Sequence, residues 1–121
     1  MIWLLTDNTA TRSSLVPLIR GKGFQVSDTE CDVNAAQRAK FSPPTLFIID
    51  CGMIDSFKTL QELRSDPYTQ SIPVVMFNID DKDLRQEALL RGANAYVGKG
   101  PMDWAELLTE IARLAGPPGP A

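Results

Sequence analysis

The chain has 121 residues, the usual size of a single domain with one hydrophobic core. Its hydrophobic fraction of 44% and charged fraction of 22% are typical of a globular protein, and no apolar run approaches the roughly 20 residues of a membrane span. The formal charge is −3 and the basic residues are scattered along the chain, which disfavours direct binding to nucleic acid.

The cysteines and the first residues exclude other classes of protein. Cys31 and Cys51 fit no metal-ligand spacing and the chain has no histidine, so we expect reduced, packed thiols and no zinc site of the usual kinds. The start, MIWLLTDN, has too short an apolar run and no basic leader for a secretory signal peptide. We therefore expect a soluble, cytoplasmic protein that does not contact a membrane.

Short apolar runs bounded by turn residues predict five strands, at 2–5, 24–26, 45–49, 73–77 and 95–97. The stretches between them are long enough for helices, and this alternation predicts a doubly wound (βα)5 α/β fold of the flavodoxin-like kind, with a parallel sheet covered on both faces. The runs at 45–49 and 73–77 are continuously apolar, which is typical of central strands. The second run alternates and the fifth is short, so we predict the strand order 2-1-3-4-5.

Three helices can be placed in chain order. The first is expected from about residue 9 to 20, with Pro17 kinking or shortening it. The next is expected from about residue 80 to 91, with Gly92 ending it. The last follows Asp103, a plausible N-cap, with an apolar stripe that should pack on the sheet: Trp104, Leu107, Leu108, Ile111 and Leu114. We expect residues 1–116 to form the domain and residues 117–121 to be a Pro/Gly-rich tail or linker stub.

Four polar residues follow the predicted strands: Asp7, Asp50, Asn78 and Lys99. In an open parallel sheet the functional crevice lies at the carboxyl ends of the strands, where the strand order reverses. Two carboxylates beside an ammonium group suit a magnesium and phosphoryl site. Taken singly, each residue is better explained as a turn former, a helix cap or a surface charge, so the interpretation depends on all four converging.

Three segments carry a resemblance to a known family, the receiver domains of two-component response regulators. PPTLFIIDCGM resembles the third strand and acceptor aspartate of the family, LRSDPYTQSIPVV its third-helix exit and fourth strand, and RGANAYVGK its fifth strand and lysine. The resemblance covers nearly the whole chain.

The resemblance implies a role for each candidate site residue. Asp50 would be the phosphoacceptor and nucleophile, Lys99 would assist catalysis and contact the phosphoryl group together with Asn78, and Tyr96 would be the switch residue. Magnesium would be bound by Asp7, Asp50 and the backbone carbonyl of Gly52. Ordinary edge-strand packing explains Tyr96 equally well.

The resemblance also implies partners. These are a sensor histidine kinase or phosphotransfer protein and a downstream effector protein, with a homodimer through the last helix possible. The domain would turn over no external substrate as an enzyme does.

The sequence departs from the family pattern around the acceptor. The usual acidic pair after the first strand reads Thr6-Asp7, the hydroxyl residue after the fourth strand is replaced by Asn78, and bulky Ile79 follows it. Lys99 is followed by Gly100-Pro101 instead of proline, and Met53-Ile54 stands where a proline is usual. Fewer ligand charges weaken binding of hard divalent ions, so we expect weakly bound Mg²⁺ and phosphorylation that is slow or demands much metal.

Two alternatives therefore stay open. One is a pseudo-receiver, a module that binds a partner protein whatever the state of Asp50. The other is an unrelated flavodoxin-like enzyme or nucleotide binder, which we rank last because no G-x-G-x-x-G loop follows the first strand.

Overall fold

The computed structural model describes residues 1–27, 38–39, 41–52, 55–78, 82–98 and 103–116. Several predictions concern residues outside these ranges and stay predictions. They are the helix expected between the second and third strands, the thiol of Cys31, the role of Lys99 and the tail at 117–121. The departures at Ile79, Gly100-Pro101 and Met53-Ile54 also lie outside the described residues.

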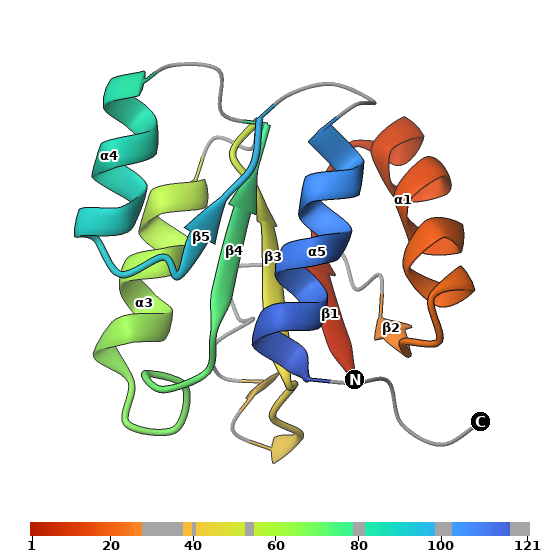
Figure 1. Cartoon of the computed structure of the whole chain (residues 1–121). Helices are drawn as coiled ribbons and strands as arrows, with labels where there is room; N and C mark the ends of the chain where they lie inside the picture. Colours follow the sequence, from red (N-terminus) through yellow and green to blue (C-terminus); the bar gives the residue numbers. More distant parts are fainter. Residues whose placement is uncertain (28–37, 40, 53–54, 79–81, 99–102, 117–121) are drawn as a thin grey trace.

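A five-stranded parallel sheet forms the centre of the domain, in the order β2-β1-β3-β4-β5. The predicted α/β fold and strand order are therefore confirmed (Figure 1). The strands are β1 Ile2–Leu5, β2 Val26–Ser27, β3 Leu46–Asp50, β4 Val74–Phe77 and β5 Ala95–Tyr96.

The second strand lies later in the chain than predicted. It begins at Val26, which pairs with Ile2, whereas the prediction began at Phe24. Phe24 packs as a partly buried side chain against the hydrophobic core instead. Its apolar character thus reflects packing beside the sheet rather than pairing within it.

Helices cover both faces of the sheet. α1 Thr9–Gly21 and α5 Asp103–Ala115 lie on one face, and α3 Ser56–Ser65 and α4 Lys82–Leu90 lie on the other (Figure 1). No helix in the described part of the chain is both long and apolar enough to span a bilayer.

The first helix continues through Pro17 to Gly21, so the shortening expected at the proline is wrong. The amide that Pro17 lacks would have bonded to the carbonyl of Ser13. Both residues are on the exposed side of the helix, where water can satisfy the free carbonyl. Leu15, Val16 and Ile19 on the opposite side are buried and hold the helix to the sheet.

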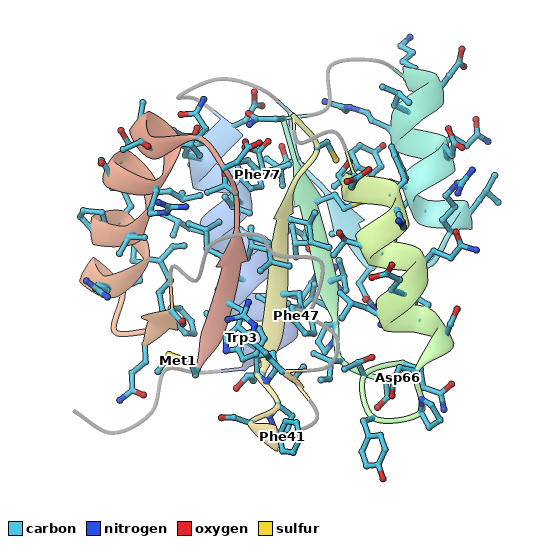
Figure 2. All side chains as sticks on the ribbon, turned by 180° about the vertical axis from the view of Figure 1, so that it is seen from behind. Met1, Trp3, Phe41, Phe47, Asp66 and Phe77 are labelled. Atoms are coloured by element: carbon cyan, nitrogen blue, oxygen red, sulfur yellow. The ribbon has the colours of Figure 1, made fainter. Side chains whose placement is uncertain are left out.

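Each face of the sheet has its own hydrophobic core because successive residues of a strand point to opposite faces. One core lies under α1 and α5, where Leu4 and Ile48 meet Leu107 and Ile111. The predicted stripe of the last helix accordingly packs on the sheet. In the other core, Trp3 and Phe47 make an edge-to-face contact with ring centroids 5.7 Å apart (Figure 2). The two cores together hold β1, β3 and β4, the strands that lead to the candidate site.

Candidate functional site

Side chains from three strand ends meet at one edge of the sheet. Leu5 is opposite Ile49 and Asp50 is opposite Phe77, so the residues that follow β1 and β4 lie beside the end of β3. A cavity of about 210 Å³ opens there, lined by Asp7, Asn8, Asp50, Gly52 and Asn78. The structure thus brings together three of the four predicted polar residues, and the fourth, Lys99, is outside the described residues.

Asp50 is buried at this edge, with 2% of its surface exposed. Its Oδ1 accepts hydrogen bonds from the Gly52 amide at 2.8 Å and from Asn78 Nδ2 at 2.7 Å. Its Oδ2 accepts a hydrogen bond from Thr6 Oγ1 at 2.7 Å. A buried carboxylate is costly unless donors compensate for lost water, and these three donors supply that compensation.

The backbone near Asp50 allows the amide donors to approach. A Cβ atom at Gly52 would lie 3.0 Å from Asp50 Oδ1, so glycine leaves room for the carboxylate. Asn78 has a φ of 68°, a left-handed conformation that asparagine tolerates better than most residues. Its side-chain amide is thereby turned toward Asp50.

Thr6 is the site residue whose role the sequence did not predict. It is fully buried, and its Oγ1 accepts a hydrogen bond from the Asn8 amide at 3.1 Å while donating to Asp50. The sequence predicted only a missing acid at this position. Its place directly before Asp7, at the end of a strand beside Asp50, was the available signal.

Asp7 lies on the exposed rim of the cavity. The neighbouring Asn8 caps α1, with its Oδ1 accepting a hydrogen bond from the Thr11 amide at 2.9 Å. Among the described residues, no group of three or more His, Cys, Asp or Glu side chains lies close enough together to hold a metal ion. The oxygen donors at this edge suit a hard divalent cation, and the carboxylates among the described residues that line the cavity are those of Asp7 and Asp50.

Cys51 follows the acceptor candidate and is an unpaired, half-buried thiol. Burial, and secondly the charge of Asp50, raise the pKa of the Cys51 thiol from 9.0 to about 12. A thiol with so high a pKa is a poor nucleophile at neutral pH. Cys51 is therefore mainly in its protonated thiol form at neutral pH.

Tyr96, the predicted switch residue, lies at the end of β5 beside α4. The guanidinium carbon of Arg85 stands 4.8 Å from the centroid of its ring, within the range of a cation–π contact. A cavity of about 440 Å³ lies next to the ring, lined by Lys82, Arg85, Gln86, Leu89 and Tyr96. Tyr96 is therefore part of a partly basic surface between α4 and β5.

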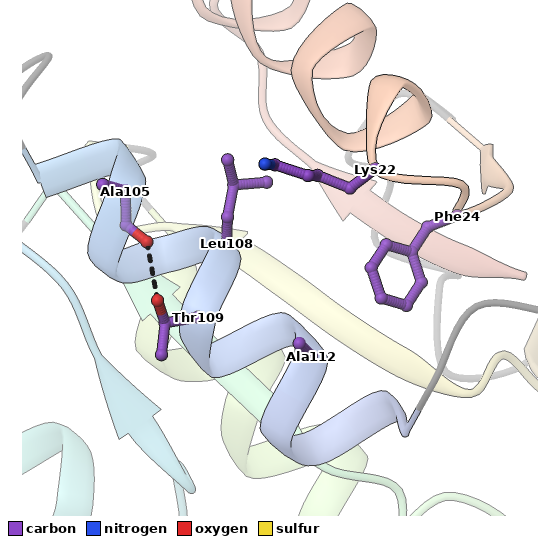
Figure 3. Close-up of a pocket in the computed structure, with 6 residues that line it drawn as sticks. All are labelled: Lys22, Phe24, Ala105, Leu108, Thr109 and Ala112. Carbon is purple, nitrogen blue, oxygen red and sulfur yellow. Dashed lines mark hydrogen bonds between the residues drawn. The ribbon is translucent and has the colours of Figure 1, made fainter.

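A larger cavity of about 490 Å³ lies away from this edge, between α5 and the turn that follows α1 (Figure 3). It is lined mainly by apolar and small side chains, including Phe24 and Leu108, with Lys22 at its border. The described residues that line it include no carboxylate, whereas Asp7 and Asp50 line the smaller cavity.

A family model, the response regulator receiver domain, matches residues 2–112, almost the whole chain. The chain belongs to this family. Receiver domains are signalling modules of two-component systems that interact with histidine kinases and effector domains.

Known proteins are similar to this domain in sequence or in fold. Protein RcaC from Microchaete diplosiphon is 27% identical over 93% of this chain and 18% of its own length, so the chain spans less than a fifth of that relative. The receiver domain of sensor histidine kinase PA1611 from Pseudomonas aeruginosa PAO1, with magnesium in its active site cleft, is 23% identical with a TM-score of 0.79, covering 95% and 96% of the two chains. An atypical orphan response regulator with a phosphorylation-independent regulatory mechanism is 16% identical with a TM-score of 0.78, covering 94% and 93%. Below 25% identity, the structural matches establish the receiver fold alone.

Proposed function

We propose that this receiver domain accepts a phosphoryl group on Asp50 from a histidine kinase or phosphotransfer protein. The observation that carries the proposal is the carboxylate of Asp50, which is held by three hydrogen bonds at a cavity that also contains Asp7. Donors that fix a nucleophile before the reaction lower the cost of orienting it.

In the proposed reaction, a carboxylate oxygen of Asp50 attacks the phosphorus of a phosphohistidine. The phosphorus–nitrogen bond breaks, its electron pair stays on the imidazole, and an acyl phosphate forms on Asp50. The Gly52 amide and Asn78 Nδ2 keep the carboxylate in place throughout. Lys99, by resemblance to the family, would offset charge on the phosphoryl group.

The carboxylates of Asp7 and Asp50 and the carbonyl of Gly52 would hold Mg²⁺. When bound, the ion would supply positive charge that offsets the negative charges of the phosphoryl group and the carboxylate. The donor atoms are hard oxygens and fit this ion, but two carboxylates give a low ligand charge and Thr6 already engages Asp50 Oδ2. We therefore propose weak binding of Mg²⁺.

We place the output of the switch on the face around Tyr96, where an effector protein or a second copy of the domain would bind. Arg85 stacks on the ring of Tyr96, and the adjoining cavity between α4 and β5 offers space for a side chain of the partner. A change in the position of Tyr96 would alter this surface directly.

The second candidate function is that of a pseudo-receiver, which binds its partner whatever the state of Asp50. The satisfied hydrogen bonds of Asp50 favour it, because the buried carboxylate needs no cation to be stable in the fold. The similar fold of a response regulator with a phosphorylation-independent mechanism supports the same candidate.

The two candidates differ in one measurable product. The protein is incubated with Mg²⁺ and a small phosphodonor such as acetyl phosphate, and its intact mass is recorded. Phosphorylation predicts one added phosphoryl group that is missing in Asp50→Asn, a variant of nearly the same shape that should stay folded. A folded wild-type protein without the adduct would support the pseudo-receiver.

A further inference from the structure

The Thr6 hydroxyl can partly replace a cation in stabilising the negative charge of the Asp50 carboxylate. It donates to Asp50 Oδ2 at 2.7 Å, and both side chains are buried, Thr6 completely. A hydrogen bond to a buried charged acceptor is stronger than one between neutral groups. The Thr6 hydroxyl thereby stabilises Oδ2 of Asp50, whereas the amide donors of Gly52 and Asn78 bond to Oδ1.

The direction of this hydrogen bond is fixed by its surroundings. Thr6 Oγ1 accepts from the Asn8 amide at 3.1 Å, so its own proton is left to point toward Asp50, whose ionised carboxylate can only accept. Arg12 Nη2 donates to the Thr6 carbonyl at 2.7 Å and holds the backbone from the other side. The hydroxyl is therefore part of a continuous chain from the Asn8 amide through Thr6 to Asp50.

Rotation of this side chain away from Asp50 is costly. Thr6 is β-branched, which restricts its χ1 rotamers, and it has no exposed surface through which its hydroxyl could reach solvent. A cation approaching Oδ2 meets a donor proton that must be displaced. The Asn8 amide would lose or change its partner in the same step.

We propose that Thr6 sets the metal dependence of this domain, because its hydroxyl competes with a divalent cation for Oδ2 of Asp50. In the cation-free protein the hydroxyl stabilises the buried charge of the Asp50 carboxylate and fixes its position. Cation binding then has to break the hydrogen bond from Thr6 to Asp50. This role rests on the proposed location of the phosphoryl and metal site at Asp50, but not on whether Asp50 is phosphorylated.

Thr6→Val tests the competition, since valine has nearly the shape of threonine and lacks the hydroxyl. Calorimetric titration with Mg²⁺ should show roughly tenfold tighter binding in Thr6→Val than in the wild-type protein, as expected for removing a competing hydrogen bond to a charged group. Thr6→Ser keeps the hydroxyl and should bind Mg²⁺ about as weakly as the wild type. Unchanged or weaker binding in Thr6→Val, or no binding in any of the three proteins, would overturn the proposal.

A second measurement uses the wild-type protein and does not depend on how well the valine variant folds. Amide resonances are followed by NMR during titration with Mg²⁺. Competition predicts that the Asn8 amide shifts together with the Gly52 amide, because Thr6 releases Asp50 as the ion binds. A shift at Gly52 with no change at Asn8 would show that the ion binds while Thr6 stays in place, and would also overturn the proposal. Neither measurement uses a phosphodonor, so failure here is distinct from failure of the phosphoacceptor function.

Discussion

Asn78 combines a left-handed backbone conformation with a side-chain hydrogen bond to Asp50. Its backbone has a φ of 68°, and its side-chain amide donates to Asp50 Oδ1 at 2.7 Å. Asparagine tolerates the left-handed conformation, whereas alanine is strained there by roughly 1–2 kcal/mol. The amide in turn stabilises a buried charge.

Replacing Asn78 separates these two contributions. We expect Asn78→Ala to lower the free energy of unfolding by about 2–4 kcal/mol, from the lost hydrogen bond to a charged group and from backbone strain. Asn78→Gly also loses the hydrogen bond, but glycine adopts the left-handed conformation without strain. Its free energy of unfolding should therefore fall less than that of Asn78→Ala. Urea denaturation of both variants measures the difference, and equal stability of Asn78→Ala and the wild-type protein would contradict the hydrogen bond.

Cys51 should make the stability of the domain fall as the pH rises above 9. The folded state raises the pKa of the thiol above its ordinary value of 9.0, to about 12, so the unfolded chain loses the proton first as the pH rises. The stability from this group is full below pH 9 and is lost between pH 9 and about 12. Melting temperatures recorded over this window should fall more steeply for the wild-type protein than for Cys51→Ala, and parallel curves would contradict the burial of the thiol.

Among the elements, α3 is tied to its neighbours by one guanidinium group. Arg64 Nε donates to the Gly92 carbonyl at 2.8 Å, Nη1 donates to the carbonyls of Gln70 and Ile72, and Nη2 donates to Asn94 Oδ1 at 2.8 Å. Burial lowers the pKa of Arg64, as expected for a guanidinium partly removed from water. Arg64 thus joins the end of α3 to the segments before β4 and β5.

A lysine at this position cannot reproduce the planar, forked set of donors. We expect Arg64→Lys to lower the free energy of unfolding by about 2–3 kcal/mol, because the partly buried carbonyls of Gly92 and Ile72 lose their donors. Arg113→Lys is the matched control, since Arg113 pairs with Glu110 on the surface of α5, where such pairs contribute about 0–1 kcal/mol. Chemical denaturation should separate the two variants, and equal losses would contradict the structural role of Arg64.

At the scale of the whole molecule, the sheet was predictable because each strand is marked by a short apolar run in the sequence. Continuous apolar runs mark β3 and β4 as central strands. These runs are apolar throughout because the side chains of both strands are buried in the two cores, one on each face of the sheet. The errors arose where tertiary contacts override local preference. Phe24 packs beside the sheet without pairing in it, and Pro17 is tolerated because its helix presents that side to water.

The candidate site was predictable only in part. Asp7, Asp50 and Asn78 were found because the carboxyl ends of neighbouring parallel strands share one edge. The hydrogen bond from Thr6 to Asp50 and the contacts of Arg64 were not found, because they join side chains far apart in the sequence and depend on register and rotamer. The same two cores that define the sheet hold these side chains in register.

The central claim is that Asp50 itself takes the phosphoryl group, and chemical trapping tests it most directly. The protein is treated with a phosphodonor and Mg²⁺, then reduced with borohydride, which converts an aspartyl phosphate to homoserine, and the peptide containing residue 50 is sequenced by mass spectrometry. Homoserine at position 50, absent from Asp50→Asn and from the untreated protein, is the predicted result. An unmodified Asp50 in a protein that carries its phosphoryl group on another residue would contradict it.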